Sequence, residues 1–589
     1  MSRLIRQLQR PFLLTLIGGL ALTAHSQPPM TAKPADIVIT NARVHTIDTG
    51  PGPNGGSIAS VVCISANMII AVGDAAIATG CSGPATRKID AGGRLVLPGF
   101  IDSHIHAIGG ARTDIGINLS LADTPEKLRA SLIALRDANH GNEVIYARGW
   151  QNHLFGSQGP TAVELDAIFG SRPVILRSVD GHSTWFSSRA LELGGASAAT
   201  RDPEPGISFF ERDAKTGALL GTAREGAGGF IVSKLVSQKT TEYEAAFRRW
   251  LPEAAAAGLT GVFDAGMGAP READAYELLA KLETEGALTL RMFTSTGDRG
   301  EKDDPVARLV ALKKRHTGEM LRPTAVKLFA DGVPEGHTAF LLAPYKDRPN
   351  FRGKPMMTAE YIQKRLIAGE KAGVPTHTHA IGGAAIRQML DAVARVRAKT
   401  SGDGRLGQRH AIAHMDLVDA ADIPRFAKLG VIAQTSMQWA TIDPSYDNLA
   451  AFVGEPVLAA AYPVKSLIAS GAVQTFGSDW PASAYLSTYK PLIQIEVAVT
   501  RRLPGNRDAP PRNAAEAITV AQAVTAITRA TAYQLGVERT LGSIEVGKRA
   551  DLIILDRNIF TIDPATIAEA SSLLTIVNGK IIRDAINKP

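Results

Sequence analysis

Short runs of alternating apolar and polar residues occur near both ends of the chain. Near the start, ADIVITNARVHTID alternates around Asn41-Ala42, and VVCISANMIIAVG and RKIDAGGRLVLPG follow it with the same texture. Near the end, ADLIILDRN and LLTIVNGKIIRD repeat the pattern, the second around Asn578-Gly579. A period of two predicts half-buried strands, and the short Asn-containing turns predict β-hairpins. We therefore expect one small β-sandwich domain built from both chain ends, residues 36–97 and 541–585.

The long middle of the chain has a different pattern. Apolar, strand-like runs recur in LTGVFDAG, LTLRMFTSTG, TAVKLFADG, GVPTHTHAIG, RHAIAHM, GVIAQTS and VQTFGSDWP. Alanine-rich segments with helical spacing, such as TAEYIQKRLIAGEKAG and AAIRQMLDAVARVRAK, separate them. With the run Leu95–His106 the strands number eight, which predicts an α/β fold, a (β/α)8 TIM barrel over residues 98–540. The further strands VIYARGW and PVILRSVDGH predict an insertion over the barrel mouth at about residues 110–255.

The first residues differ from the rest of the chain. MSRLIRQLQR contains three arginines and no acid, and the uninterrupted apolar run PFLLTLIGGLALTA follows it. Ala24-His25-Ser26 then places small residues where a signal peptidase needs them, so residues 1–26 are predicted to be a secretory signal peptide. A membrane anchor is the alternative, but the run is short for a bilayer span. We expect an exported protein, periplasmic or secreted, with no stable membrane anchor after cleavage.

Charge and cysteine content narrow the class of protein. The formal net charge is +7, and loss of the three N-terminal arginines leaves +4. So small a balance over 589 residues gives no reason to expect nucleic acid as a partner. Cys63 and Cys81 are the only cysteines and no CxxC occurs, which excludes a thiolate zinc site. In an exported protein they could form one disulfide, and two free buried cysteines are the alternative.

Side chains with metal-binding or acid–base chemistry lie near the carboxyl ends of five predicted barrel strands. They are His104, His106, Lys327, His379, His414 and Asp479. His104 and His106 are two residues apart, so they share one strand face and can reach one metal ion. Taken singly, such residues could be a snorkelling lysine, hydrogen-bonded core histidines or a helix cap. Because catalytic groups of a TIM barrel lie at this edge, the six together predict a metal centre.

The phrases around these residues resemble the amidohydrolase superfamily, whose members carry HxH on the first strand, lysine on the fourth, histidines on the fifth and sixth, and aspartate on the eighth. LPGFIDSHIH, DGHSTWFSSRAL, KLFADG, HAIGG, GSDWP and GSIEVGKRADLIILD are most similar to amidohydrolase family 3, the YtcJ-like branch that includes N-substituted formamide deformylase. Three motifs of this chain differ from those common in that branch. The chain has HAIGG where members commonly have HAIGD, AHM where they have EHA, and DGVPEGHTAF where they have a serine-containing DGS. These departures concern the surroundings of the metal ligands and the substrate pocket.

The resemblance implies two divalent ions, with zinc expected first and iron or manganese as alternatives. One ion would be held by the two histidines of the first strand and Asp479, and the other by His379 and His414. His377 shares a strand face with His379 and rivals it, but the resemblance selects His379. A CO2-derived carbamate on Lys327 would bridge the ions. A metal-bridging hydroxide would attack the substrate, with Asp479 as general acid and base.

The expected activity is that of an amidohydrolase, which cleaves a C–N bond of a small amide, N-formyl or cyclic amide compound. An ester or carbamate hydrolase on the same site is one alternative, because an activated water attacks many carbonyls. A non-catalytic binding or regulatory protein that kept the fold is another. The expected substrate-binding residues are His182, His337, Trp439 and Trp480. A homodimer is an option that the sequence leaves open.

Overall fold

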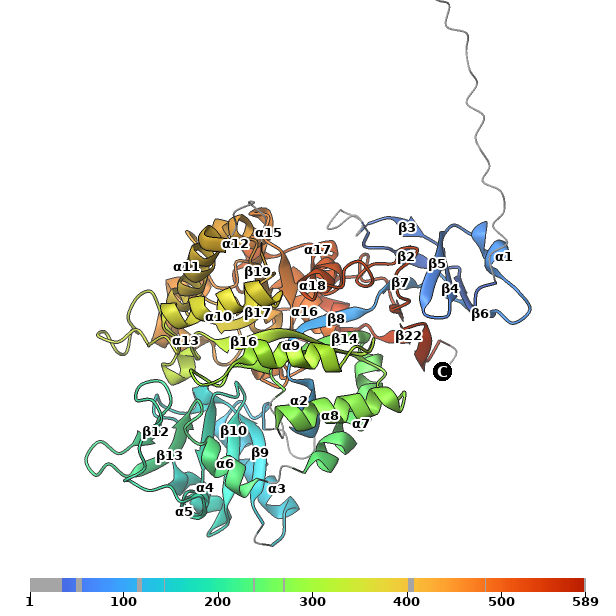
Figure 1. Ribbon diagram of the computed structural model, residues 1–589. Coiled ribbons are helices and arrows are strands. Elements are labelled where there is room, and N and C mark those ends of the chain that lie inside the picture. Colours follow the sequence, from blue (N-terminus) through green and yellow to red (C-terminus); the bar gives the residue numbers. More distant parts are fainter. Residues whose placement is uncertain are drawn as a thin grey trace, which may run out of the picture.

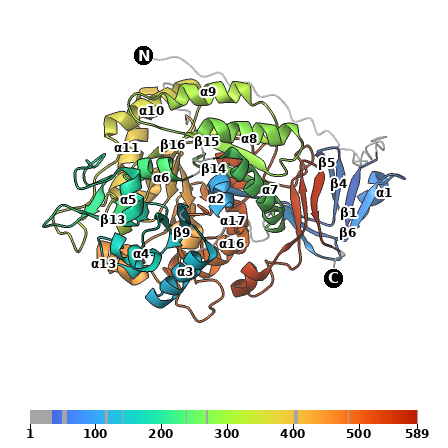
Figure 2. The same ribbon diagram turned by 90° about the horizontal axis from the view of Figure 1, so that it is seen from below.

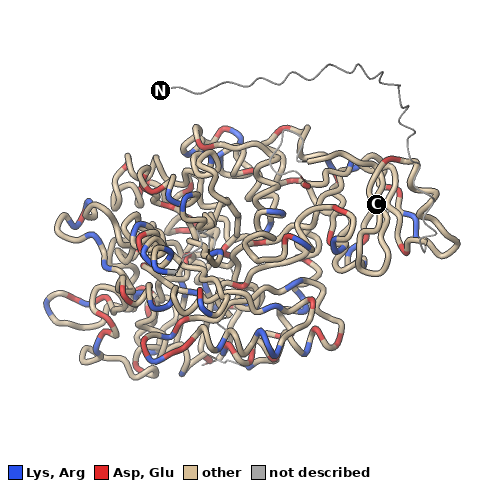
Figure 3. Tube along the Cα trace, turned by 45° about the horizontal axis from the view of Figure 1, so that its top comes forward, with Lys and Arg blue, Asp and Glu red and all other residues tan. Residues whose placement is uncertain are grey.

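The computed structural model describes residues 34–48, 56–113, 119–141, 143–236, 239–267, 271–400, 407–482 and 484–586. The predicted signal peptide, residues 1–26, lies outside the described residues. Figures 1 and 2 show three parts: a central barrel, a lobe against it, and a β-rich part at the far side. Lys and Arg are interspersed with Asp and Glu along the trace (Figure 3). In the segments described, no helix combines the length and hydropathy that a bilayer crossing requires.

Eight parallel strands form the central sheet. Each pairs with its neighbour in chain order: β8 (Phe100–Ile105), β14 (Leu259–Asp264), β15 (Arg291–Gly297), β16 (Leu321–Phe329), β17 (Thr376–Ala380), β18 (Ala411–His414), β19 (Ile432–Thr435) and β20 (Gln474–Phe476). Just beyond β20, the backbone N–H of Asp479 donates to the carbonyl of His104 at 2.7 Å, which joins the last strand to the first. The predicted TIM barrel is confirmed.

Helices cover the outside of the barrel. The longer ones are α7 (Thr240–Ala256), α8 (Glu272–Thr284), α9 (Pro305–Arg315), α10 (Ala359–Ala372), α11 (Gly383–Thr400) and α16 (Pro491–Thr500). In α10, the Thr358 side chain accepts from the N–H of Tyr361 at the first turn, and Gly373 in the left-handed region ends the helix. The buried Ile362 and Leu366 are four residues apart, so they face the barrel together.

The run Leu95–His106, predicted as one strand, is two strands in two sheets. β7 (Leu95–Pro98) pairs with strands of the β-rich part, whereas β8 starts the barrel. Gly99 lies between them, and a Cβ at this position would overlap the side chain of Thr260. Glycine is therefore required where the chain passes from one sheet to the other.

Strands from both chain ends build the β-rich part. The first sheet contains β5 (Met68–Gly73), β4 (Val61–Ser65), β1 (Ile37–Thr40) and β6 (Arg87–Asp90). The second contains β23 (Lys580–Asp584), β22 (Ser572–Val577), β21 (Leu552–Leu555), β7, β2 (Arg43–His45) and β3 (Ile58–Ala59). Val62 and Ile64 of the first sheet share one buried core with Leu552 and Ile576 of the second. The two sheets therefore pack face to face.

One of the two predicted hairpins is correct. β22 and β23 pair antiparallel around Asn578-Gly579, as the sequence predicted. The hairpin predicted around Asn41-Ala42 is wrong, because β1 pairs with β4 and β6 while β2 pairs with β3 and β7. Asn41 has a φ of 49° and directs the chain from the first sheet into the second. Alternation identified the strands but not their partners.

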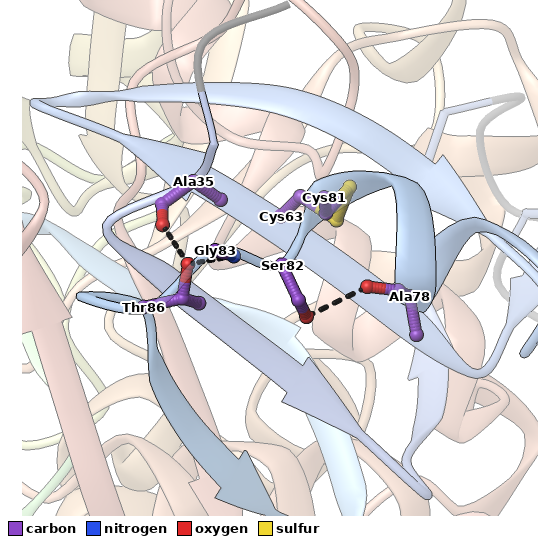
Figure 4. The surroundings of a disulfide bond; sticks show 7 residues. All are labelled: Ala35, Cys63, Ala78, Cys81, Ser82, Gly83 and Thr86. Carbon is purple, nitrogen blue, oxygen red and sulfur yellow. Dashed lines mark hydrogen bonds between the residues drawn. A yellow bond between two sulfur atoms is a disulfide. The ribbon is translucent and has the colours of Figure 1, made fainter.

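Cys63 and Cys81 form a disulfide in the first sheet (Figure 4). Cys63 lies on β4, and Cys81 is the last residue of α1 (Ile77–Cys81). Close to the disulfide, the Thr86 hydroxyl donates to the carbonyl of Ala35 at 2.7 Å and so connects the start of the described chain to β6. The disulfide decides between the two alternatives for this cysteine pair.

A five-stranded sheet follows the first barrel strand along the chain. Its order is β12 (Phe210–Arg212), β13 (Leu219–Arg224), β11 (Ser183–Phe186), β10 (Val174–Ser178) and β9 (Ile145–Trp150). Its helices are α3 (Pro125–Ala138), α4 (Ala162–Phe169), α5 (Ser188–Gly194) and α6 (Gly229–Leu235). The turns after β9 and β10 line a cavity together with loops that follow β16 to β19. This lobe therefore lies against the carboxyl ends of the barrel strands. The helix that follows it, α7, packs against α2 (Ala107–Thr113) and β22.

Candidate metal centre

The side chains of the six candidate metal-site residues meet at the carboxyl end of the barrel. They are His104, His106, Lys327, His379, His414 and Asp479, from β8, β16, β17, β18 and the turn after β20. Five of the six residues are buried, whereas the His106 side chain is 28% exposed. Lys327 and His379 lie on the inner faces of their strands. The residues two positions before and after each of them share that face, because alternate residues of a strand point the same way. His106 is therefore the member of this group that solvent reaches most.

His104 lies at the middle of the group. Its Nε2 atom is 3.4 Å from Oδ1 of Asp479 and 3.1 Å from Nζ of Lys327. Nε2 of His106 is 3.2 Å from the same Asp479 oxygen. One ligand atom from each of His104, His106 and Asp479 therefore lies within 4.8 Å of the others, a spacing that one metal ion can bridge. Within the described part of the chain this is the one such group of three or more His, Cys, Asp or Glu residues.

His379 and His414 form a second pair beside the first group. Their ring centroids are 4.5 Å apart, and the His414 ring is 4.8 Å from the His104 ring. Nδ1 of His414 is 3.8 Å from Oδ2 of Asp479, so the aspartate lies between the two sets of imidazoles. Two adjacent positions for divalent ions are consistent with this arrangement.

One ring nitrogen of each candidate imidazole has a hydrogen-bond partner, and in His379 this nitrogen is Nε2, which donates to the carbonyl of Gly332 at 3.2 Å. Nδ1 of His104 donates to Oε1 of Gln434 at 3.0 Å, and Nδ1 of His106 donates to the carbonyl of Gly266 at 3.4 Å. Nδ1 of His414 lies 3.0 Å from the Ser436 hydroxyl. Such contacts fix the ring orientation, and those on Nδ1 leave Nε2 of His104, His106 and His414 for a metal. The sequence analysis missed Gln434, although a glutamine inside the buried strand VIAQTS was a usable signal.

His377, the rival of His379, lies behind His104. Its Nε2 is 3.0 Å from Nδ1 of His104, on the side opposite the nitrogen that faces Asp479. The His379 ring instead packs directly against that of His414. This geometry supports His379 as the ligand and His377 as a residue that orients His104.

Burial controls the protonation of the centre. Burial, together with the charge of Lys327, lowers the pKa of His104 well below its ordinary value. Burial likewise lowers the pKa of His379 and His414. Neutral imidazole is the form that binds metal ions. Burial also lowers the pKa of Lys327 to about 8, so this amine loses its proton more readily than a surface lysine.

Two buried atoms at the centre indicate whether a metal ion fits between these side chains. Nε2 of His414 and Oδ1 of Asp479 have no hydrogen-bond partner among the described residues. Leaving a buried polar atom unsatisfied is costly, so such atoms call for an explanation. A divalent cation would satisfy both, and a set of imidazole and carboxylate donors suits zinc, iron or manganese. These residues therefore fit a metal centre.

Asp102 fastens the first barrel strand to the last. Its fully buried carboxylate accepts from the N–H groups of His104 and Ser478, both at 3.0 Å. These two N–H groups belong to the segments that carry His104 and Asp479. Asp102 therefore sets the position of candidate ligands from opposite ends of the barrel sequence. Strand alternation places Asp102 on the same face as His104, but the sequence does not reveal its bond to Ser478.

A cavity lies between the barrel and the five-stranded lobe, next to this centre. Its empty volume is about 830 Å³, including the part open to solvent. Carboxylates and aromatic rings line much of it, among them Asp180, Glu335, Asp416, Trp439, Tyr462 and Tyr485. The Trp439 ring stacks on the His414 ring at a centroid distance of 5.2 Å. Trp439 thus lies between the cavity and the metal centre.

His182 lies at the edge of the metal centre. Its ring is 5.3 Å from the ring of His379, and its Nδ1 is 2.8 Å from Oε2 of Glu225. Burial alone would lower the pKa of His182, but the Glu225 carboxylate outweighs it and raises that pKa to about 9. The imidazole is therefore held as a cation that can face a substrate oxygen. Glu225 was missed because it lies 43 residues from His182 in the sequence.

Two predicted substrate-binding residues lie elsewhere. His337 packs against Tyr345 with ring centroids 4.8 Å apart, and its Nε2 is 2.8 Å from Asp347. Trp480 stacks on Trp250 at 5.5 Å and is 3% exposed. Neither residue lines the cavity, because the Trp480 side chain packs in the hydrophobic core and the His337 side chain is held by Tyr345 and Asp347. Position after a strand end was too weak a criterion for these two residues.

Comparisons with known proteins agree with this geometry. A model of the amidohydrolase family matches residues 87–583. The protein YtcJ of Bacillus subtilis (strain 168) is 26% identical over 510 residues, which cover 85% of this chain and 91% of that protein. The N-substituted formamide deformylase of Arthrobacter pascens is 28% identical over 579 residues, 92% of this chain and 97% of the enzyme.

A solved structure shows the same fold. The crystal structure of an uncharacterized metal-dependent hydrolase from Pyrococcus furiosus superposes with a TM-score of 0.65 at 24% identity. The match covers 89% of this chain and 100% of that one. The barrel, the lobe and the β-rich part are therefore not unique to this sequence.

Proposed function

Because this chain belongs to the amidohydrolase family, we propose that it is a metal-dependent hydrolase that cleaves a C–N bond in a small amide, N-formyl or cyclic amide compound. The observation that carries the proposal is the convergence of five potential ligands and Lys327. Two atoms of this group, Nε2 of His414 and Oδ1 of Asp479, have no hydrogen-bond partner among the described residues. The likeness to N-substituted formamide deformylase supports N-formyl compounds as the first class to test.

The residues that would hold the metal divide into two groups. The two histidines of β8 and Asp479 would bind one divalent ion, and His379 and His414 a second. A carbamate formed on Lys327 would supply the oxygen ligands that an amine cannot. Burial lowers the pKa of the Lys327 amine to about 8. This supports the carbamate, because only the unprotonated amine reacts with CO2. When bound, the ions would polarise the scissile carbonyl and lower the pKa of a water molecule.

Asp479 is proposed to move the proton. Its Oδ1 faces His104 and His106, and its Oδ2 faces His414. Its Oδ1 would be available to hold a metal ion, and its Oδ2 would accept the proton of the attacking water and return it to the leaving nitrogen. His182, held by Glu225, donates from Nε2 to the carbonyl oxygen as negative charge develops there.

Export of the protein is part of the same proposal. The N-terminal pattern of residues 1–26 predicts a signal peptide. The Cys63–Cys81 disulfide supports export, since disulfides persist in oxidising compartments.

A metal analysis with a substrate panel tests the function. Purified protein is assayed for zinc, iron and manganese, and then given N-alkyl formamides, anilides, cyclic amides and matched esters. We expect bound metal and turnover of at least one amide class that chelators abolish. Faster turnover of the esters than of every amide would favour the ester hydrolase. Bound metal without turnover of any compound would contradict the proposal and favour a binding or regulatory protein.

A further inference from the structure

The cavity beside the metal centre is lined by several carboxylates and little positive charge. Asp180, Glu335, Asp416 and Asp443 belong to its wall, and of the described residues that line it Arg512 is the cationic one. The four acids come from the five-stranded lobe and from three separate barrel loops. Four carboxyl groups from separate chain segments in one partly buried wall require a reason, because burying a carboxylate without a partner is costly.

Glu335 has no partner that accounts for its position. Among the described residues its side chain forms no hydrogen bond or salt bridge with another residue, although the His182 imidazolium acts on it through its charge. Burial, and then the Asp180 carboxylate, raise its pKa to about 8. Asp416 is also incompletely satisfied: Oδ2 accepts from the Tyr462 hydroxyl at 2.7 Å, while buried Oδ1 has no hydrogen-bond partner among the described residues. A cation bound beside these two groups would favour their carboxylate forms, which can accept further hydrogen bonds from it.

Arg512 acts on Asp416 through its charge but forms no salt bridge with it, so it offsets this wall only in part. Its guanidinium donates to the backbone carbonyls of Trp439 at 3.1 Å and Leu458 at 3.3 Å. Its flat faces are occupied as well, because Tyr446 and Tyr462 lie 5.2 and 4.8 Å away. Arg512 is thus committed to holding loops together, and it forms no salt bridge to a described carboxylate.

A bare metal ion does not fit the acids. A cation with several carboxylate ligands needs their oxygen atoms within a few ångströms of one point. Among the described residues, the acids of this wall do not form a group with ligand atoms within 4.8 Å of one another. The acids are instead spread around a cavity that is partly open to solvent, which suits an organic cation with several N–H donors.

The aromatic part of the wall suits the same ligand. Trp439 and Tyr485 line the cavity and carry no cation on their rings among the contacts of the described residues. The face of an aromatic ring attracts an ammonium or guanidinium group. Trp439 also stacks on His414, so a group bound against it lies next to the candidate metal centre.

We propose that this cavity binds a cationic group of the substrate, so that the preferred substrates are amides carrying an ammonium or guanidinium group some atoms away from the scissile C–N bond. The proposal rests on the proposed hydrolase function and adds the substrate class. Glu335 and Asp416 supply the hydrogen-bond acceptors, and Trp439 supplies the aromatic face.

Three formamides of equal chain length test the substrate class. N-formyl-1,5-diaminopentane ends in an ammonium group, N-formylhexylamine in a methyl group, and N-formyl-6-aminohexanoate in a carboxylate. We expect kcat/KM to be about tenfold or more higher for the ammonium compound than for the methyl compound, since a hydrogen bond to a charged group discriminates by that order. The carboxylate compound should be the poorest. Equal or lower kcat/KM for the ammonium compound overturns the proposal.

Variants then locate the selectivity. Glu335→Gln and Asp416→Asn keep the shape of each side chain and remove its charge, so each should lower the ratio of ammonium to methyl kcat/KM about tenfold. Glu301→Gln removes an exposed surface carboxylate and should leave the ratio unchanged. A wild-type ratio in both cavity variants contradicts the assignment.

Binding of a simple cation separates the two proposals. Hexylammonium titrated into the metal-loaded protein by calorimetry reports on the cavity without any turnover. Binding that Glu335→Gln weakens, with none of the three formamides hydrolysed, would reject formamide hydrolysis and retain the cation site. Hydrolysis of N-formylhexylamine without hexylammonium binding would retain the hydrolase and reject the cation site.

Discussion

The metal centre and the neighbouring cavity are built in opposite ways. The centre uses side chains on or directly after barrel strands, and most of these are at least 95% buried. The cavity uses loop residues from the barrel and the lobe, such as Glu335, Asp416 and Asp180, which are partly exposed. Strands fix a side chain to within the precision that metal coordination needs, whereas loops can be exchanged without disturbing the barrel. We infer that the centre determines the reaction and the cavity determines the substrate.

Removing the carboxylate shared by both sides of the centre should have the largest effect. Asp479→Asn keeps the shape of the side chain but cannot take a proton, so kcat should fall about a thousandfold. Stopped assays on the best amide substrate measure this, with metal content determined on the same samples. Asp508→Asn, on the exposed surface, is the matched control. A variant that retains its metal and the wild-type kcat would show that Asp479 does not carry the proton.

Loss of the buried Lys327 should lower the activity by lowering the amount of bound metal. Lys327→Ala removes the only amine within 3.1 Å of His104 Nε2 in the described structure, so we expect fewer ions per chain and a kcat about a hundredfold lower. Added formate or acetate should restore part of the rate by replacing the carbamate. The exposed Lys313→Ala serves as control. Unchanged metal content and rate would remove the carbamate from the proposal.

A residue behind the centre should have a smaller effect. Gln434→Leu removes the acceptor of the His104 Nδ1–H bond, and loss of such a bond typically weakens metal binding 10- to 100-fold. Competition with a chromogenic chelator measures that affinity. Gln434→Glu preserves an acceptor at the same place and should bind metal more tightly than Gln434→Leu. If both variants bind as tightly as the wild type, Gln434 has no part in orienting His104.

The contrast between strands and loops also explains what could be predicted. The eight barrel strands and the Asn578-Gly579 hairpin follow from periodicity and turn chemistry, which are local properties. The split of Leu95–His106 at Gly99 was missed because it depends on contact with Thr260, more than 150 residues away. The partners of β1 and β2 were missed for the same reason, since alternation does not specify which strand lies alongside.

Candidate site residues divide in the same way. His104 and His106 could be placed on one face from their spacing, and the other four candidates were found near the ends of predicted barrel strands; the resemblance then selected His379 over His377. Gln434 and Glu225 act through side-chain contacts with residues distant in the sequence, so no local pattern identifies them. His337 and Trp480 follow strand ends as Trp439 does, but their side chains pack against other residues outside the cavity.

Trp439 and Trp480 offer a direct comparison between cavity and packing. Trp439→Phe replaces the indole that lines the cavity next to His414 with a smaller ring. It should raise KM a few-fold with little change in melting temperature. Trp480→Phe removes part of the stack with Trp250 and should lower the melting temperature instead. Steady-state kinetics and thermal unfolding on both variants check this. A larger KM effect for Trp480→Phe would reverse the assignment of the two rings.

The disulfide should have the smallest effect on catalysis, because it lies in the β-rich part and outside both regions compared above. Cys63 and Cys81 are 18 residues apart, and closing a loop of that length stabilises the folded state by about 3 kcal/mol. The double variant Cys63→Ala/Cys81→Ala should therefore lose about that free energy of unfolding in denaturant titrations while kcat/KM stays at the wild-type value. Wild-type protein treated with a reductant should lose a similar amount. A fall in kcat/KM at temperatures where the variant is fully folded would mean that the β-rich part influences the centre, most directly through β7, which continues into the strand that carries His104.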